Sequence, residues 1–223
     1  MNDIVLYNST DIIEILNDGE QKTIEETKYL KEIEVIKLLS NIKNELHSLL
    51  FLFLFETGAR CTEALLVKMK DIDPYNKTVK LITLKRHKDK NGNRKPPVYR
   101  VLTISDALLS RILLYERRLN LSLKDDIFTR KAGNGHISIQ AVNQAMGKYV
   151  VSILGEEYKS YGHPHVLRHS RAIQLLNSGE VDLTKLMKIL GHSHIRNTMI
   201  YSQFSNKDIQ DAVRRANAKI GLY

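Results

Sequence analysis

The stretch from Gly162 to Tyr201 restricts the fold of this chain more than any other part of the sequence. It reads GHPHVLRHSRAIQLLNSGEVDLTKLMKILGHSHIRNTMIY and predicts two helices separated by a turn. Pro164 suits the first turn of a helix, where its missing N–H costs nothing. Gly179 is expected to end that helix. Asp182 then predicts the N-cap of a second helix, and Gly191 predicts its end.

Four side chains of this stretch suit phosphate chemistry. His165 and Arg168 are three residues apart, so both project from one face of the first helix. His192 follows the end of the second helix, and Tyr201 comes nine residues later. No pair of carboxylates accompanies them to hold a metal ion. Each residue alone has an ordinary structural explanation, and it is their order and spacing that favour a functional site.

The order HxxR, then LGH, then a tyrosine nine residues after that histidine resembles the C-terminal half of the tyrosine recombinase (phage integrase) family. The matching segments are HPHVLRHS and LLNSGEVDLTKLMKILGHSHIRNTMIYSQFS. A third segment, TGARCTEALLVKMKDID, resembles the family's TG-x-R-x-x-E motif. It places Arg60 between a buried helix, Leu46 to Phe55, and a short helix that starts near Thr62. Glu63 is expected to brace this segment rather than to take part in chemistry.

The resemblance covers residues 29 to about 215 and implies both a fold and a reaction. The fold is mainly α with a small antiparallel β-sheet (α+β), that of the tyrosine recombinase catalytic domain. The reaction is site-specific cleavage and rejoining of DNA through a 3′-phosphotyrosyl intermediate, which conserves the bond energy and needs no ATP. No cofactor and no metal ion are expected.

The same resemblance assigns roles to five residues. Tyr201 is the nucleophile, and its hydroxyl needs activation because an unperturbed tyrosine has a pKa of about 10. Arg60 and Arg168 hold the non-bridging oxygens of the phosphate. His165 assists proton removal, and His192 donates a hydrogen bond to the phosphate.

A predicted β-hairpin supplies the remaining catalytic group. Its strands are Thr78 to Leu84 and Val98 to Ile104, joined by a turn at Asn91-Gly92. In the family this hairpin carries a catalytic lysine that protonates the 5′ oxygen. TLKRHK followed by VYRVLTI resembles the family's LK…R.VP pattern and favours Lys85, with Lys88 as the alternative if the strand continues three residues further.

The tip of this hairpin is strongly basic. A charge run is usually a solvated surface, but so one-sided a hairpin favours contact with the DNA backbone. The residues expected to contact DNA are Arg86, Lys88, Lys90, Arg94 and Lys95.

The overall charge also favours a polyanionic partner. The chain has 223 residues, a net charge of +9 and a pI near 9.5. Residues 1–28 carry a net charge of −5, so residues 29–223 carry +14. Cys61 is the only cysteine, which excludes an internal disulfide and fits a reducing cytoplasm. The longest apolar run, Leu49 to Phe55, is too short to span a bilayer, which needs about 20 residues.

The chain is expected to divide into a short acidic segment, residues 1–28, and a catalytic domain, residues 29–223. In that domain a helix begins near Leu30, and its apolar face is marked by Leu30, Ile33, Ile36 or Lys37, and Leu39 or Ser40. Further helices are expected over 105–122, 138–154 and 206–220. By resemblance the last of these passes to a neighbouring protomer, so that the protein forms a homotetramer on double-stranded DNA.

Several alternatives stay open. Most family members carry a helical core-binding domain of roughly a hundred residues before the catalytic domain. A chain with only 28 residues there is a minimal recombinase like the fimbrial phase-switch enzymes, a truncated Xer-like chain, or a protein whose clamp comes from an accessory DNA-binding protein. The other functions considered are a type IB topoisomerase and a non-catalytic DNA-binding protein that uses the Asp182–Gly191 helix as half of a helix-turn-helix.

Overall fold

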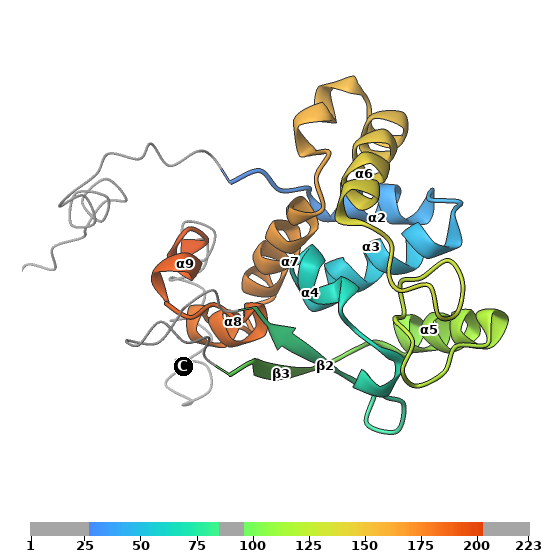
Figure 1. Ribbon diagram of the computed structural model, residues 1–223. Helices are drawn as coiled ribbons and strands as arrows, with labels where there is room; N and C mark the ends of the chain where they lie inside the picture. The colour runs from blue at the N-terminus through green and yellow to red at the C-terminus, as the bar shows by residue number, and fades with distance from the viewer. Residues whose placement is uncertain (1–26, 85–95, 203–223) are drawn as a thin grey trace, which may run out of the picture.

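The computed structural model describes residues 27–84 and 96–202, which form a helical body with a small sheet along one edge (Figure 1). The sheet is antiparallel with strand order β1-β2-β3. This confirms the predicted fold class. The helices are α2 (Glu32–Ser40), α3 (Glu45–Thr57), α4 (Cys61–Leu65), α5 (Asp106–Leu119), α6 (Ile139–Leu154), α7 (His165–Asn177), α8 (Leu183–Leu190) and α9 (Arg196–Met199), with 3-10 turns η1 (Met69–Asp71) and η2 (Glu156–Tyr161). The strands are β1 (Ile72–Asp73), β2 (Thr78–Thr83) and β3 (Val98–Thr103).

Helix α3 forms the centre of the core, as its apolar sequence predicts. Leu50, Phe51 and Phe53 are completely buried, and α3 packs against α7, α5 and α2. The ring of Phe53 meets Phe128 edge to face at a centroid distance of 5.1 Å. The helix ends at Gly58, whose φ of 59° is in the left-handed region that glycine favours. The chain therefore turns sharply just before Arg60.

The two long strands pair in register from Thr78 opposite Thr103 to Thr83 opposite Val98. Val79 and Leu81 point into the core and are completely buried. β2 also contacts α4, and β3 contacts α8. The sheet thus contacts α4, which begins just after Arg60, and α8, which ends just before His192. The predicted hairpin strands are confirmed, whereas the two-residue strand β1 was too short for the sequence to reveal.

Helix α2 forms where it was predicted but buries a different face. Val35 and Leu38 are buried, whereas Ile33 is 71% exposed and Ile36 is 53% exposed. The predicted face was wrong because EIEVIKLLS has apolar residues around most of its circumference. Two overlapping stripes fit the helical period, and only the packing of α2 against α3, α6 and α7 selects one of them.

Helices α7 and α8 enclose a separate small core. Its buried members are Ala172, Ile173, Leu176, Leu186, Leu190 and Tyr201. α8 begins and ends as predicted, since the side chain of Asp182 accepts a hydrogen bond from the Lys185 N–H at 2.7 Å and Gly191 has a φ of 67°. Tyr201 therefore packs as a core residue in this structure.

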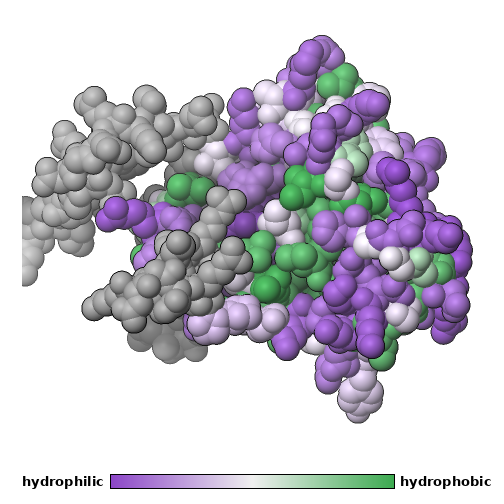
Figure 2. Space-filling model, in the orientation of Figure 1, coloured by the Kyte–Doolittle hydropathy of each residue, from purple (hydrophilic) through white to green (hydrophobic). Residues whose placement is uncertain are grey.

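Most of the face in Figure 2 is hydrophilic, with apolar residues gathered near its middle. Across the described segments, no helix has the length and apolarity needed to cross a membrane. The expectations for residues 1–26, for the hairpin tip at 85–95 and for the helix at 206–220 lie outside the described residues.

Candidate active site

Arg60 lies at the N-terminus of α4, just after the turn that ends α3. Its backbone N–H donates to Glu63 Oε2 at 3.1 Å, and its guanidinium donates to Glu63 Oε1 at 3.0 Å. The Arg60 side chain is 34% exposed, whereas that of Glu63 is fully buried. The short helix thus holds a partly open guanidinium in place with a buried carboxylate, as expected for a bracing Glu63.

Glu63 has a second arginine partner, Arg100 on β3. The Arg100 guanidinium donates to Glu63 Oε2 at 2.8 Å and to Thr83 Oγ1 at 3.0 Å. Burial by itself raises the pKa of the Glu63 carboxyl, but the hydrogen bond and charge of Arg100, together with Arg60, outweigh it and leave the pKa lowered. Glu63 is therefore ionised at neutral pH.

Arg168 links the turn after α3 to the end of α8. It is 1% exposed and donates to the Gly58 carbonyl at 2.6 Å and to the Leu190 carbonyl at 2.9 Å. Burial and the charge of Arg60 lower the pKa of Arg168 to about 9, so it stays charged at neutral pH. An arginine has five N–H donors, and these two bonds leave others for an anion.

His165 and His192 approach these arginines from α7 and from the end of α8. His165 is the first residue of α7, and the residue as a whole is exposed. Even so, partial exclusion of water by the surrounding protein, followed by the charges of Arg168, His163 and Arg60, lowers the pKa of His165 to about 4. His192 is half-buried, and its Nδ1 lies 2.9 Å from Thr198 Oγ1. Burial, then Arg168 and Arg60, lower the pKa of His192 to about 3.

Tyr201 lies in the small core and is 1% exposed. Its hydroxyl forms a hydrogen bond with His169 Nδ1 at 2.7 Å. Burial raises the pKa of Tyr201 to about 12, although the charges of Arg168 and Arg60 act in the opposite direction. In this conformation the hydroxyl is bound to an imidazole and closed to solvent.

His169 was not among the residues predicted from the sequence. It lies one turn after His165 on α7, and the two rings meet edge to face at a centroid distance of 4.5 Å. Burial, then His165 and Arg168, lower the pKa of His169 to about 3. The spacing of four residues could have placed both rings on one helical face, but only the folded chain shows that Tyr201 is the partner of His169.

The structure thus brings Arg60, His165, Arg168, His192 and Tyr201 to one region, where the arginines influence the pKa of each of the other three. The hairpin residues Lys85, Arg86, Lys88, Lys90, Arg94 and Lys95 lie outside the described residues. Lys85 is only two residues beyond Thr83, the residue that binds Arg100.

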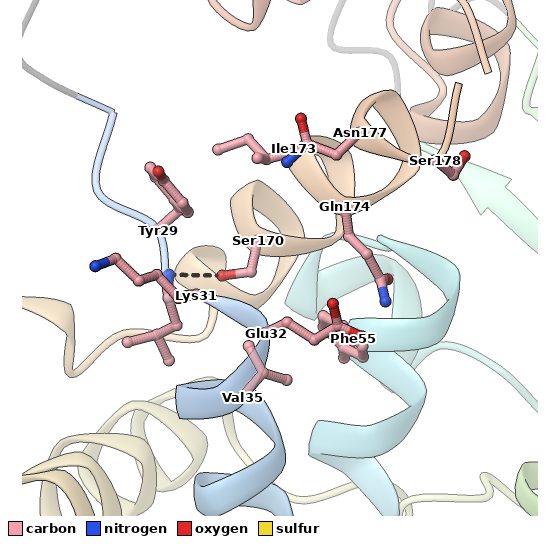
Figure 3. Close-up of a pocket in the computed structure, with 11 residues that line it drawn as sticks. Tyr29, Lys31, Glu32, Val35, Phe55, Ser170, Ile173, Gln174, Asn177 and Ser178 are labelled. Atoms are coloured by element: carbon pink, nitrogen blue, oxygen red, sulfur yellow. Dashed lines mark hydrogen bonds between the residues drawn. The ribbon is translucent and has the colours of Figure 1, made fainter. Parts of the chain in front are cut away.

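The described segments hold no group of three or more His, Cys, Asp or Glu side chains that could bind a metal ion. A pocket of about 530 Å³ lies between α7, α3 and the chain leading into α2 (Figure 3). Ser170, Ile173 and Gln174 line it, and Ser170 accepts a hydrogen bond from the Leu30 N–H at 2.8 Å. These residues lie on a different face of α7 from Arg168, and none of the predicted catalytic residues that the structure describes lines this pocket.

Comparison with known proteins identifies relatives with recombinase names. The chain is 27% identical over 191 residues to tyrosine recombinase XerA of Saccharolobus solfataricus, which covers 86% of this chain and 57% of that protein. It is 30% identical over 193 residues to tyrosine recombinase XerC of Bacillus licheniformis, which covers 83% of this chain and 59% of that protein. The chain therefore spans about three fifths of the length of these relatives.

Solved structures share the fold. XerH site-specific recombinase in a post-cleavage complex with palindromic difH substrate superposes with a TM-score of 0.65 at 21% identity, over 87% of this chain and 55% of that one. The catalytic domain of bacteriophage HP1 integrase superposes with a TM-score of 0.56 at 24% identity, over 85% of this chain and 95% of that one. The sequence profile of the phage integrase family matches residues 28–208. This chain therefore belongs to the phage integrase family, the family of tyrosine recombinases.

Proposed function

We propose that this chain is the catalytic part of a site-specific DNA recombinase, with residues 29–223 as its catalytic domain. It cleaves one DNA strand through Tyr201 and rejoins it without ATP or a metal ion. Arg60, His165, Arg168 and His192 act on the scissile phosphate, and Lys85 protonates the leaving 5′ oxygen.

The single observation that carries this proposal is the excess of positive charge around Arg168. The site has three guanidinium groups, those of Arg60, Arg100 and Arg168. The pKa of Arg168 is affected by one carboxylate, that of Glu63. Burial, followed by the charge of Arg168, lowers the pKa of His165 to about 4 and that of His192 to about 3, so both rings are neutral at neutral pH. A phosphodiester carries the negative charge that such a site lacks.

Tyr201 has to leave its present position before it can react. A hydroxyl that is closed to solvent and bound to His169 cannot contact a phosphate in duplex DNA. α9 has only four residues, and residues 191–195 separate it from α8, so the segment that carries Tyr201 can shift without unfolding α7 or α8. We infer that DNA binding moves this segment and brings the hydroxyl to the arginines.

The sequence position of Lys85, just after strand β2, supports its proposed role. Thr83 Oγ1 binds Arg100, which binds Glu63, which binds Arg60. Lys85 follows Thr83 by two residues in the sequence. Lys88 begins three residues further along the hairpin.

Relatives with solved structures support a DNA partner. The XerH recombinase is described bound to difH substrate, and the Tn1549 transposon integrase is described in complex with transposon right end DNA. By analogy we propose that this chain binds double-stranded DNA, with the basic hairpin on the phosphate backbone, and assembles as a homotetramer that exchanges strands.

The test is covalent capture of DNA. Wild-type protein is mixed with nicked duplexes of randomised sequence. Cleavage near the nick releases a short fragment, and its loss prevents rejoining. Adducts that survive denaturation are collected and their DNA is sequenced. We expect adducts from the wild type, none from Tyr201→Phe, and DNA binding in both. Excess EDTA should leave the yield unchanged. Adducts from Tyr201→Phe, or loss in EDTA with recovery in Mg²⁺, would contradict the proposal.

A further inference from the structure

Arg100 is the buried guanidinium that links the sheet to the site. It lies on β3 opposite Leu81, on the core side of the sheet, and its side chain is 9% exposed. One amino group donates to Thr83 on the neighbouring strand, and the other donates to Glu63 on α4. One side chain thus connects both long strands to the helix that carries Arg60.

Glu63 transmits the position of Arg100 to Arg60. Its Oε2 accepts from Arg100 at 2.8 Å, and its Oε1 accepts from Arg60 at 3.0 Å. Glu63 is fully buried, so its carboxylate cannot turn toward water. Among the described residues, the Arg60 guanidinium donates its hydrogen bond to Glu63. Arg60 therefore depends on a carboxylate that Arg100 holds from the other side.

Arg100 also lies against the turn before His192. A Cβ atom placed on Gly191 would be 2.8 Å from the Arg100 Nη1 atom and 3.1 Å from Thr83 Oγ1. Only a residue without a side chain allows so close an approach. The charge of Arg100 contributes to the lowered pKa of His192, which agrees with this proximity.

The hydrogen bonding of Arg100 itself is incomplete. Its Nε is buried and has no acceptor within the part of the chain that the structure describes. A buried donor without a partner is unfavourable, so the guanidinium is not placed where its own hydrogen bonding is best. Its position serves Glu63 and Thr83 instead. Departures of this kind from local optimisation concentrate at functional sites.

We propose that Arg100 is a positioning residue of the recombination site, an inference that rests on the proposed function. Through Glu63 it fixes the guanidinium of Arg60, and through Gly191 it fixes the turn that carries His192. The hairpin strand β3 thereby sets the geometry of two groups that act on the phosphate.

The test compares two substrates of the same sequence, taken from the adduct selection. One has a normal scissile phosphate, and the other has a methylphosphonate, which lacks one negative charge and so needs less stabilisation by arginine. Adduct rates are measured at saturating protein. The adduct rate of Arg60→Ala should fall about 100-fold on the phosphodiester and much less on the methylphosphonate. Arg100→Gln should show the same pattern with a loss of about tenfold, because it displaces Arg60 rather than removing it.

Two further variants keep the test decisive. Arg100→Lys keeps the charge but cannot bind Glu63 and Thr83 with a planar fork, so its loss should be intermediate. This variant replaces Arg100→Gln if thermal unfolding shows that the latter does not fold. The matched control is Arg111→Gln, because Arg111 on α5 donates to Ser48 at 2.7 Å and neither residue has a proposed catalytic role. It should change neither rate.

The outcomes separate the two proposals. Unchanged rates in Arg100→Gln, or an equal loss on both substrates, overturn the positioning role, because a general loss of structure does not depend on the charge of the phosphate. A wild-type protein that forms no adduct overturns the proposed function and this role with it.

Discussion

Lys85 and Lys88 differ in what their removal should cost. A general acid is needed only because an alkoxide leaves poorly, and a 5′-phosphorothiolate leaves without a proton. Lys85→Ala should therefore form adduct slowly on normal DNA and recover on the phosphorothiolate. Lys88→Ala should lose mainly affinity, because it is expected to contact only the DNA backbone. The measurement is the adduct rate on both substrates at saturating protein. Recovery of Lys88→Ala, but not of Lys85→Ala, would move the role by three residues.

The half-buried histidines give a second prediction for single residues. Burial, followed by nearby positive charges, lowers the pKa of His169 and of His192 from 6.5 to about 3 in the folded protein. The unfolded chain therefore takes up protons first, so acid favours unfolding. The stabilising effect is fully present above about pH 6.5 and is lost as the pH falls toward about 3. At pH 5 each histidine should cost at most about 2 kcal/mol of unfolding free energy.

Urea unfolding followed by circular dichroism at pH 7 and pH 5 checks this. The window lies above the range in which most carboxylates titrate, so histidines dominate the change. His169→Gln keeps a hydrogen-bond acceptor for Tyr201 but removes the titrating group. Its unfolding free energy should depend less on pH than that of the wild type. Equal pH dependence in the two proteins would contradict the lowered pKa.

At the level of secondary structure, local signals decided what the sequence could predict. Asp182 and Gly191 mark the ends of α8 because a cap and a left-handed glycine act on their own helix. The face of α2 was predicted wrongly because Ile33 and Val35 belong to two competing stripes, and distant helices select between them. The Arg100–Glu63 bond joins residues 37 apart in the sequence, and no local pattern encodes such a pair.

In the site, too, local sequence patterns could be predicted and contacts between distant residues could not. Motif spacing identified Arg60, His165, Arg168, His192 and Tyr201, and the fold brings these residues together. The roles assigned to them remain proposals. Their second layer of contacts escaped prediction, because the bond between Tyr201 and His169 depends on how the chain after α8 folds back onto α7.

Two glycines that follow helices should differ in how much stability and activity they lose when changed to alanine. Gly191 and Gly179 both have positive φ, at 67° and 75°. A Cβ on Gly191 would meet Arg100 at 2.8 Å, whereas one on Gly179 would meet nothing within 4 Å. Each change to alanine should cost about 1 kcal/mol for the left-handed backbone. Gly191→Ala should cost more than Gly179→Ala and should also slow adduct formation, because it displaces Arg100.

Chemical denaturation gives the stabilities of both variants, and the nicked-duplex assay gives their adduct rates. Since the backbone strain is shared, the difference between them isolates the contacts of residue 191 with Arg100 and Thr83. Equal stability and equal adduct rates in the two variants would show that this contact is unimportant.

For the whole molecule, charge and length raise the question of assembly. Residues 29–223 carry +14, and the chain spans about three fifths of the length of the relatives XerA and XerC. A basic catalytic domain holds DNA largely through phosphates, so a single copy should bind weakly and with strong dependence on salt. Contacts between copies would then have to hold the protein and the DNA strands in the arrangement that strand exchange requires.

Residues 206–223 are the segment expected to make those contacts. Cleavage of one strand needs the residues of one site, whereas exchange needs neighbouring copies to act together. Deletion of residues 206–223 should therefore reduce formation of recombinant product much more than formation of the Tyr201 adduct. Light scattering of the DNA complex should show a tetramer for the full chain and smaller species for the deletion. Removal of residues 1–26, which precede the described fold, is the control and should leave the ratio of recombination to cleavage unchanged. An equal loss of both activities in the 206–223 deletion would argue that this segment acts within its own subunit.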